Sequence, residues 1–445
     1  MKRWVFSIVL FACVLVGAVA SVDKPRVVVM TDISTLKVGV GEPDDTQSLI
    51  RFLLYSNEFD VEGLIATATG RGGEVHPDYI QTIIRAYGEV HANLVKHDPR
   101  YPKQEFLLSL VKAGLPGTEC IGEGLDSEGS NWIISVVDKA DQRPVWIVIW
   151  GGPRELAQAL WRVEKERTKE ELAAFKSKIR VFAISDQDRT ASWIRARHPD
   201  LFYITSKLAF RGMYRGGDES LVSMEWVDTH VNRGHGSLGL AYPNYDGGDP
   251  WGRVRGVKEG DTPSFLYLIP NGLGNPEHPE WGSWGGRYIG KGKHYFDAKD
   301  IVESNSATVW DERATVFRWR PAYQADFQAR LDWCVLPPEQ ANHPPVVSID
   351  GPSELRVRSG ERVDLKASTC SDPDGNHLSY RWFVYREAGT YDGTVEIHGA
   401  QSSQMWFTSP EVDSPKTLHI VLAVTDDGDP PLTRYGRVVV TVEPR

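Results

Sequence analysis

The sequence of 445 residues predicts an α/β domain with a mainly parallel sheet flanked by helices, followed by an all-β domain of the immunoglobulin-like sandwich type. Over the first three quarters of the chain, short apolar runs alternate with stretches of helical periodicity, which is typical of parallel strands joined by helices. After a proline-rich break, apolar residues recur at every second position and turns become frequent. This change of period indicates that a second domain begins there.

Residues 1–20 are predicted to be a signal peptide. A positively charged start is followed by an almost wholly apolar run over residues 4–16, and Ala18-Val19-Ala20 fits a small-residue cleavage site. The apolar run is short for a membrane span and no other segment approaches one, so we predict no stable span. The mature protein is therefore expected to be exported, to the periplasm or the extracellular space.

The α/β domain is predicted to span residues 22–336. Its apolar runs are short and nearly continuous, as expected of strands that are buried on both faces. Residues 234–295 are rich in Gly, Pro, Trp, Tyr and Asn, and we expect long loops over the sheet there. The predicted strands are residues 27–31, 61–67, 145–149 and 179–184, and the predicted helices are residues 78–95, 153–164 and 169–176.

Residues 337–345, which begin with Pro337-Pro338 and end with Pro344-Pro345, are predicted to be a linker. Residues 346–445 then alternate apolar and polar positions between turns such as Asp372-Pro373-Asp374-Gly375. About 100 residues of short strands and frequent turns favour a β-sandwich of the immunoglobulin, PKD or cadherin type. The aspartates in its loops are explained by turn chemistry, with Ca²⁺ binding as the alternative.

Composition excludes some classes of partner. The net charge of −10 argues against binding a nucleic acid polymer, which requires basic patches. Outside the leader the cysteines are Cys120, Cys334 and Cys370, which form neither a disulfide framework nor a zinc pattern. Whether Cys334 pairs with Cys370 is left open, as is the oligomeric state, for which a homo-oligomer is one alternative.

Acidic residues are concentrated where predicted strands end and helices begin. Asp32 ends the first strand, Asp44 and Asp45 begin a helix, Trp150 precedes a glycine turn and helix, and Asp261 follows far along the chain. One edge of an α/β sheet can collect all of them. Such crowded charge requires a cation or a retained proton, so the cluster is either a hard-metal site or a set of acid/base carboxylates. Attraction to the helix dipole would explain an aspartate at the helix start but not Asp32.

This ordered set resembles the inosine–uridine-type nucleoside hydrolases. It is still more similar to a bacterial family of cellulose-binding proteins, whose first domain is nucleoside-hydrolase-like and whose second is a β-sandwich. The supporting phrases are Gly63-Leu64-Ile65-Ala66-Thr67-Ala68, Ser185-Asp186-Gln187-Asp188 and Ile269-Pro270-Asn271-Gly272-Leu273. The resemblance covers nearly the whole mature chain.

The resemblance implies a bound Ca²⁺ held by Asp32, Asp44, Asp45 and Asp261, with a backbone carbonyl near Trp150. It also implies that Asp32 takes a proton from a metal-bound water, which then attacks the anomeric carbon of a sugar. The predicted function is therefore Ca²⁺-dependent hydrolysis of N- or O-glycosidic bonds, with a carbohydrate or glycoside as the partner.

Three features differ from the hydrolase pattern. Eleven residues, 33–43, separate Asp32 from Asp44, Met30 replaces an aspartate, and Gly260 replaces a histidine that is a proposed leaving-group acid. The resemblance is therefore weakest for the release of purines. The residues that could replace that acid are His230, His235, Glu259 and Asp188, and the sequence does not choose among them.

The predicted substrate contacts lie in the loops of the first domain. Asp186-Gln187-Asp188 follows a strand at the same sheet edge, and Glu42 lies in the inserted segment. Ordinary alternatives are a turn role for Asn271, a loop histidine at His235, and burial rather than sugar stacking for Trp251. The complete set is Glu42, Asp186, Gln187, Asp188, His235, Asn271 and Trp251.

Two other functions are compatible with these features. A non-catalytic protein that binds cellulose or another plant polysaccharide would keep the hydrolase-like metal pocket for sugar recognition. A scaffold would use its β-sandwich to bind other partners at the cell surface.

Overall fold

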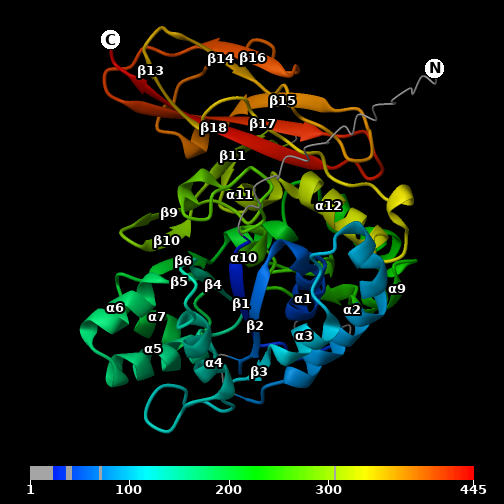
Figure 1. Cartoon of the computed structure of the whole chain (residues 1–445), viewed down its shortest axis with the longest axis vertical. Coiled ribbons are helices and arrows are strands. Elements are labelled where there is room, and N and C mark those ends of the chain that lie inside the picture. The colour runs from blue at the N-terminus through cyan, green and yellow to red at the C-terminus, as the bar shows by residue number, and fades with distance from the viewer. Residues whose placement is uncertain (1–23, 37–42, 70–72, 305–306) are drawn as a thin grey trace, which may run out of the picture.

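The computed structural model describes residues 24–36, 43–69, 73–304 and 307–445. The predicted signal peptide at residues 1–20 and the predicted substrate contact Glu42 lie outside the described residues. The chain forms an α/β unit with a smaller all-β unit stacked above it in the view of Figure 1. The predicted fold class is confirmed by this arrangement.

An eight-stranded sheet forms the centre of the α/β unit, in the order β3-β2-β1-β4-β5-β6-β10-β9. All neighbouring strands pair in parallel except β9 and β10, which are antiparallel. All six residues of β1 are buried, because helices cover both faces of the sheet. The strands are β1 (Arg26–Thr31), β2 (Asp60–Ala66), β3 (Val111–Ala113), β4 (Val145–Ile149), β5 (Ile179–Ile184), β6 (Phe202–Ser206), β9 (Tyr288–Lys291) and β10 (His294–Asp297).

Alternate residues of β1 pack into two different cores. Val27 and Val29 contribute to one core, which includes residues of α1 and α2, whereas Val28 and Met30 contribute to the other, which includes residues of α4 and α5. This alternation follows from the two-residue period of a strand. The helices of this unit are α1 (Asp44–Leu54), α2 (Pro77–His97), α3 (Gln104–Ser109), α4 (Glu128–Val137), α5 (Arg154–Glu166), α6 (Lys169–Ser177), α7 (Arg189–Arg197), α8 (Met224–Val227), α9 (Gly236–Ala241), α10 (Pro263–Leu266), α11 (Ala314–Phe317) and α12 (Arg320–Asp332).

The expectation of loops over residues 234–295 is wrong at its C-terminal end. There β9 and β10 form a hairpin that extends the main sheet beyond β6. Each strand has only four residues, and glycines at 290 and 292 weaken the strand pattern, so edge pairing decides their structure. Two further two-stranded ribbons are β7 (Tyr245–Gly247) with β8 (Val254–Gly256), and β11 (Asp300–Ser304) with β12 (Ala307–Asp311).

The all-β unit is a sandwich of a four-stranded sheet and a two-stranded sheet. The orders are β13-β18-β17-β15 and β14-β16. Val363 and Phe407 from the two-stranded sheet share one core with Trp382, Ile420 and Val440 from the other. The strands are β13 (Glu354–Arg358), β14 (Arg362–Lys366), β15 (Ser379–Val384), β16 (Gln404–Thr408), β17 (Lys416–Thr425) and β18 (Thr433–Glu443).

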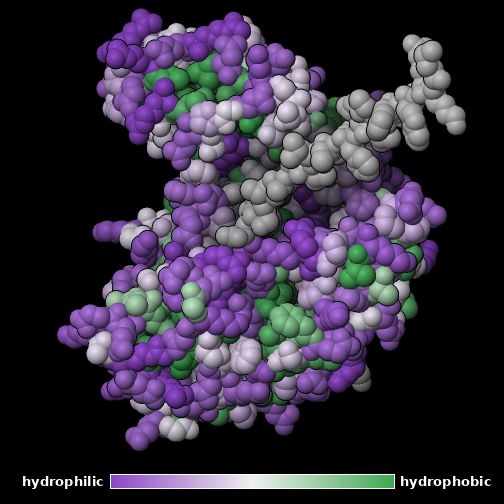
Figure 2. Space-filling view, viewed as in Figure 1, coloured by the Kyte–Doolittle hydropathy of each residue, from purple (hydrophilic) through white to green (hydrophobic). Residues whose placement is uncertain are grey.

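The four-stranded sheet faces the α/β unit, and aromatic residues join the two (Figure 1). The ring centroids of Trp319 and Tyr435 lie 5.7 Å apart, and those of Trp319 and Tyr385 lie 5.6 Å apart. Arg434 of β18 forms a 2.7 Å ion pair with Asp326 of α12. The viewed surface is mostly hydrophilic, and a hollow separates the two units on one side (Figure 2).

The predicted linker, residues 337–345, is packed against both units. Trp333 Nε1 donates a 2.9 Å hydrogen bond to the carbonyl of Asn342, and the Asn342 side chain donates to Asp426 of the sandwich. The described cysteines are free thiols, so Cys334 and Cys370 are not joined. Among the described residues, no helix combines the length and the apolar character that a membrane crossing requires. The short helical turns are η1 (Ser56–Glu58), η2 (Ala209–Met213), η3 (Glu219–Val222), η4 (Asp228–Asn232), η5 (Pro279–Trp281), η6 (Pro338–Gln340) and η7 (Arg386–Ala388).

Candidate functional site

Three of the predicted aspartates form a compact cluster. Ligand atoms of Asp44, Asp45 and Asp261 all lie within 4.8 Å of one another. Asp44 and Asp45 form the start of α1, and Asp261 lies just before α10, whose first residue is Pro263. Asp45 is 8% exposed and Asp261 is 2% exposed, so these charges are largely removed from water.

Asp32 joins this cluster from the end of β1. Its side chain lies against the glycine turn after β4, where a Cβ on Gly151 would be 2.5 Å from Asp32 Cγ. The charges of Asp45, Asp44 and Asp32 all act on Asp261. The structure therefore brings the four predicted aspartates together, because the strands carrying Asp32 and the glycine turn are neighbours in the sheet.

The cluster has an excess of negative charge. Burial, followed by repulsion from Asp45, Asp44 and Asp32, raises the pKa of Asp261 well above its ordinary value, and Lys258 opposes that shift. Lys258 Nζ lies 3.9 Å from Asp44 Oδ2, and the hydroxyl of Thr31 donates to Asp45.

Within the described ranges, no hydrogen-bond donor reaches the buried Asp261 Oδ2. Crowded, buried carboxylate oxygens with one lysine beside them fit a hard divalent cation.

Trp150 stands between the cluster and the loop after β5. Its carbonyl accepts a hydrogen bond from the side-chain amide of Gln187, and its indole Nε1 donates to Ser264 Oγ at 2.9 Å. Ser264 Oγ in turn donates to the carbonyl of Asp261. The predicted carbonyl ligand therefore belongs to the same hydrogen-bonded edge as the late aspartate.

A pocket of about 230 Å³ opens beside the cluster. This volume lies below the roughly 300–1,000 Å³ of sites for drug-sized ligands, so it suits one sugar ring rather than a length of polymer. The pocket is lined by Asp44, Ile184, Ser185, Gln187, Phe210, Arg211, Tyr214, Asp249, Pro250, Lys258 and Asp261.

Several lining residues were not predicted from the sequence. Lys258 is 3% exposed. Its place three positions before Asp261 is the sequence feature that could have predicted a lysine in this pocket. Phe210 comes from the helical turn η2, and Tyr214 and Asp249 come from irregular segments, all without a motif. A Cβ on Gly260 would lie 3.1 Å from Asp44 Oδ2 and 3.4 Å from the ring of Phe210, so a larger residue there would enter the acidic cluster.

The predicted residues after β5 have different surroundings. Asp186 forms ion pairs with Arg195 at 2.6 Å and with Lys207 at 2.9 Å. Asp188 Oδ1 caps α7, while Oδ2 faces Gly152, whose Cβ would lie 2.0 Å away. Gln187 lines the pocket. Asp186 is thus engaged in ion pairs and Asp188 packs against the glycine turn, whereas Gln187 faces the site.

The structure does not bring His235 or Asn271 to the pocket. The ring of His235 contacts Asp332 Oδ1 at 3.1 Å and the carbonyl of Val231 at 3.2 Å. Asn271 accepts a 2.8 Å hydrogen bond from the backbone N–H of Tyr435, so it lies at the contact with the sandwich.

Trp251 is 48% exposed, and its ring lies 4.8 Å from the guanidinium of Arg211, which lines the pocket. Among the other substitutes for the missing histidine, the ring of His230 lies 5.5 Å from that of Trp226, and Glu259 is buried against Arg51 and Tyr242.

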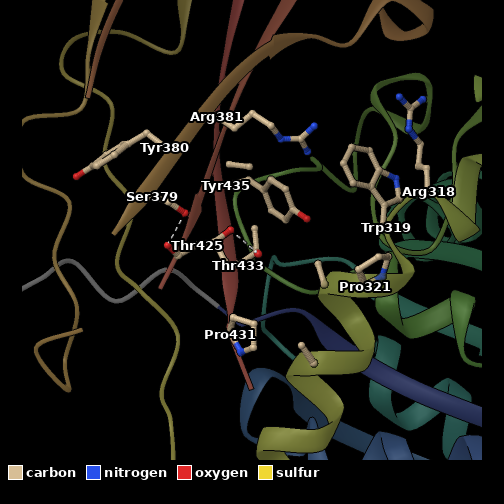
Figure 3. Close-up of a pocket in the computed structure, with 13 residues that line it drawn as sticks. Arg318, Trp319, Pro321, Ser379, Tyr380, Arg381, Thr425, Pro431, Thr433 and Tyr435 are labelled. Carbon is tan, nitrogen blue, oxygen red and sulfur yellow. Dashed lines mark hydrogen bonds between the residues drawn. The ribbon is translucent and has the colours of Figure 1, made fainter. Parts of the chain in front are cut away.

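A second cavity, of about 300 Å³, lies between the two units (Figure 3). Arg318, Trp319 and Pro321 border it from the α/β unit, and Figure 3 shows the sandwich residues opposite them. Ser379 Oγ donates a 3.0 Å hydrogen bond to the carbonyl of Thr425, whose hydroxyl bonds that of Thr433 at 2.9 Å. Tyr380, Arg381 and Tyr435 complete the sandwich wall.

Comparison with protein families gives two matches. Residues 26–288 match the model of the cellulose-binding Sde182 nucleoside hydrolase-like domain. Residues 362–442 match the model of the C-terminal domain of the cellulose-binding protein Sde0182. The two matches correspond to the α/β unit and the sandwich.

Comparison with solved structures gives a nucleoside hydrolase-related hypothetical protein from Saccharophagus degradans that is associated with carbohydrate metabolism. It is 35% identical with a TM-score of 0.79, and the match covers 95% of this chain and 100% of that one. The PKD domain from KIAA 1837 protein is 24% identical over 21% of this chain and 86% of its own, with a TM-score of 0.17. No curated protein matches. The chain belongs to the family of cellulose-binding Sde182 proteins, with a nucleoside hydrolase-like domain followed by the Sde0182 C-terminal domain.

Proposed function

We propose that this protein is an exported, Ca²⁺-dependent hydrolase that cleaves an N- or O-glycosidic bond of a sugar. The observation that carries the proposal is the cluster of Asp32, Asp44, Asp45 and Asp261 beside a pocket of about 230 Å³. The pocket suits a small glycoside or the end of a chain. If that chain is a carbohydrate polymer outside the cell, the substrate and the predicted export of the protein agree.

Asp44, Asp45 and Asp261, with the carbonyl of Trp150, would hold the ion. Ca²⁺, when bound, would supply the positive charge that orients sugar hydroxyls and makes a nearby water more acidic. Asp45 is positioned for this role by the hydroxyl of Thr31, and Asp261 by its place before α10. Asp261 has to lose any proton that it holds before it can act as a ligand.

Asp32 would act as the general base. Its side chain is held at the turn after β4 by the close approach of Gly151, at the same edge as the pocket. From there it would take a proton from the water that attacks the anomeric carbon, while positive charge develops on the sugar ring. A carboxylate that activates water in this way parallels the inverting glycosidases.

The pocket offers cationic donors instead of a histidine. Lys258 lies beside Asp44, and Arg211 lies between Phe210 and Trp251. We infer that Lys258 steadies the departing group by hydrogen bonding, since the ammonium has three donors. Asp249 is held by Tyr214 and Arg215, which makes it a supporting residue.

The test is a screen of nucleosides and aryl glycosides with the purified protein, with and without a Ca²⁺ chelator. We expect turnover of at least one substrate that the chelator abolishes and that Ca²⁺ restores. Asp32→Asn should reduce kcat/KM by about 10²-fold or more, the range of a lost acid/base group. Asp261→Asn should weaken Ca²⁺ binding and reduce kcat/KM through the lost ligand. Turnover that survives both the chelator and Asp32→Asn would overturn the proposal.

A second candidate function is binding of a carbohydrate without turnover. It is favoured by the cavity in Figure 3, where Trp319, Arg381 and Tyr435 offer aromatic and guanidinium groups beside hydroxyl residues. Cellulose-binding assays would distinguish this candidate. Binding that falls with Arg381→Ala but not with Asp261→Asn, in a protein that turns over no glycoside, would support it over the hydrolase.

A further inference from the structure

A second group of aspartates lies where the linker meets the loops of the sandwich. Asp372 belongs to the loop before β15, Asp426 directly follows β17, and Asn342 belongs to the linker. Hydrogen bonds join the three residues. Asn342 Nδ2 donates to Asp426 Oδ1 at 2.9 Å, and Asn342 Oδ1 accepts from Asn376 Nδ2 at 2.9 Å. The backbone N–H of Asn376 donates to Asp372 Oδ1 at 3.0 Å.

Each of the two carboxylates uses one oxygen and leaves the other without a donor. Asp426 is 4% exposed, and its Oδ1 also accepts from the N–H groups of Gly428 and Leu432 at 3.0 and 2.9 Å. Asp372 Oδ1 accepts from the N–H of Asp374 at 2.9 Å. In the described part of the chain, Oδ2 of Asp426 and Oδ2 of Asp372 are both buried and have no hydrogen-bond partner.

The two carboxylates also repel each other. Burial raises the pKa of Asp426, against the hydrogen bonds from Leu432, Asn342 and Gly428, and the charge of Asp372 raises it further. No lysine or arginine in the residues that the structure covers forms an ion pair with either aspartate. The neighbouring Asp374 has its own partner, because His343 Nδ1 lies 3.0 Å from it. Buried, unpaired carboxylate oxygens are costly unless a cation or a proton lies between them.

We propose that Asp372 and Asp426, with the amide oxygen of Asn342, form a second Ca²⁺ site, separate from the acidic cluster of the α/β unit. Two carboxylates and a side-chain amide oxygen are hard ligands of the kind that Ca²⁺ prefers. Of the three proposed ligands, Asn342 also lines a pocket, together with Asn376 and Gly428.

This site would control how the two units are held together. The carbonyl of Asn342 accepts a hydrogen bond from Trp333, which follows α12 of the α/β unit, while its side chain contacts Asp426 of the sandwich. An ion that fixes Asn342 therefore fixes the linker between its two neighbours. Without the ion, residues 337–345 would open more readily to solvent and to proteases.

The test is calorimetric titration of the full chain with CaCl₂. In the Asp261→Asn background, which removes the first cluster, we expect one Ca²⁺ to bind per chain. Adding Asp426→Asn or Asp372→Asn should weaken that binding at least tenfold. The matched control is Asp413→Asn, because Asp413 is exposed and lies at the other end of the ten-residue strand β17. It should leave binding unchanged.

A second measurement covers the case in which a double variant does not fold. Limited proteolysis of the Asp261→Asn chain should cut within residues 337–345 faster after chelation than with Ca²⁺. Binding and protection that are equal in the Asp426→Asn, Asp372→Asn and Asp413→Asn chains would overturn the second site. The first cluster is tested separately. If Asp261→Asn alone left Ca²⁺ binding unchanged from wild type, the first cluster would not be a Ca²⁺ site, whatever the result for Asp372 and Asp426.

Discussion

The position of Asp32 depends on the absence of a side chain at Gly151. A Cβ there would lie 2.5 Å from Asp32 Cγ and 2.6 Å from Oδ1, so Asp32 would have to move. We predict that Gly151→Ala lowers Ca²⁺ affinity and kcat/KM by about tenfold or more, equivalent to about 1.4 kcal/mol. Calorimetry and steady-state kinetics would measure the two effects. Gly248→Ala is the control, since its Cβ would meet open space, and equal behaviour of the two variants would contradict this account.

Lys258 allows a test that separates charge balance from leaving-group assistance. Its ammonium lies 3.9 Å from Asp44 and competes with a cation for the same carboxylates. We predict that Lys258→Met strengthens Ca²⁺ binding several-fold while kcat falls about tenfold. Lys366→Met, on the exposed side of β14, should change neither quantity. If kcat stayed at the wild-type value, Lys258 would serve only to balance charge.

At the scale of elements, α12 connects the α/β core with the sandwich through buried charges. Arg330 is 1% exposed and donates to Asp326, Asn57, Glu58 and the carbonyl of Leu54 at 2.7–2.8 Å. Removing it would leave buried acceptors unpaired, so Arg330→Met should lower the free energy of unfolding by about 3–5 kcal/mol. Urea denaturation would measure the loss.

The control for α12 is an exposed arginine of the sandwich. The side chain of Arg356 is 78% exposed and pairs with Glu443 at 2.9 Å. Arg356→Met should cost less than about 1 kcal/mol, as exposed ion pairs do. Equal losses in the two variants would show that the buried network of Arg330 is not what stabilises α12.

At the scale of the whole molecule, the free energy of unfolding should fall in acid. His419 of β17 is 3% exposed, and burial, followed by the charge of Arg437, lowers its pKa to about 3. Arg437 Nη1 lies 3.2 Å from His419 Nδ1, an arrangement in which the imidazole accepts and stays neutral. In the unfolded chain the His419 imidazole binds a proton near pH 6.5, whereas in the folded chain it binds one only near pH 3. Stability is therefore lost as pH falls through this window.

Each pH unit below 6.5 should cost about 1.4 kcal/mol through His419, so about 2 kcal/mol is lost by pH 5. Measuring the free energy of unfolding from pH 7.5 to 5 in wild type and His419→Gln would isolate this contribution, because the other histidines are common to both. The variant should show the shallower profile. Parallel profiles would contradict the prediction. Below about pH 4 the ion pair of Asp326 adds a loss of the same sign, since the nearby Arg434 and Arg330 hold its pKa down against the effect of burial.

Residue patterns were sufficient for four of the strands in the main sheet and for the order of acidic residues along the chain. The runs ending at Thr31 and Ile149 are strands β1 and β4, as predicted, and these are neighbours in the sheet. A period of two or 3.6 residues is local information, which a sequence carries directly. The walls of the pocket were missed because Phe210, Tyr214 and Asp249 come from a short helical turn and from irregular segments, whose course no local pattern reports.

Contacts between residues far apart in the sequence were not predicted either. Asn271 was predicted to contact substrate, yet its carbonyl accepts from the N–H of Tyr435, more than 160 positions away. The hairpin of β9 and β10 joins the sheet through β6 rather than through any strong propensity of its own.

By itself, the sequence determined the two-domain α/β and β-sandwich architecture and the acidic residues at strand ends, because both follow from local periodicity and from the rule that parallel strands end at one edge. Only the tertiary structure decided that Lys258 and Gln187 face that edge while His235 and Asn271 do not. It alone placed Asp372 beside Asp426. These outcomes depend on how loops distant in sequence pack together, which is settled by burial and by the pairing of polar groups across the whole chain.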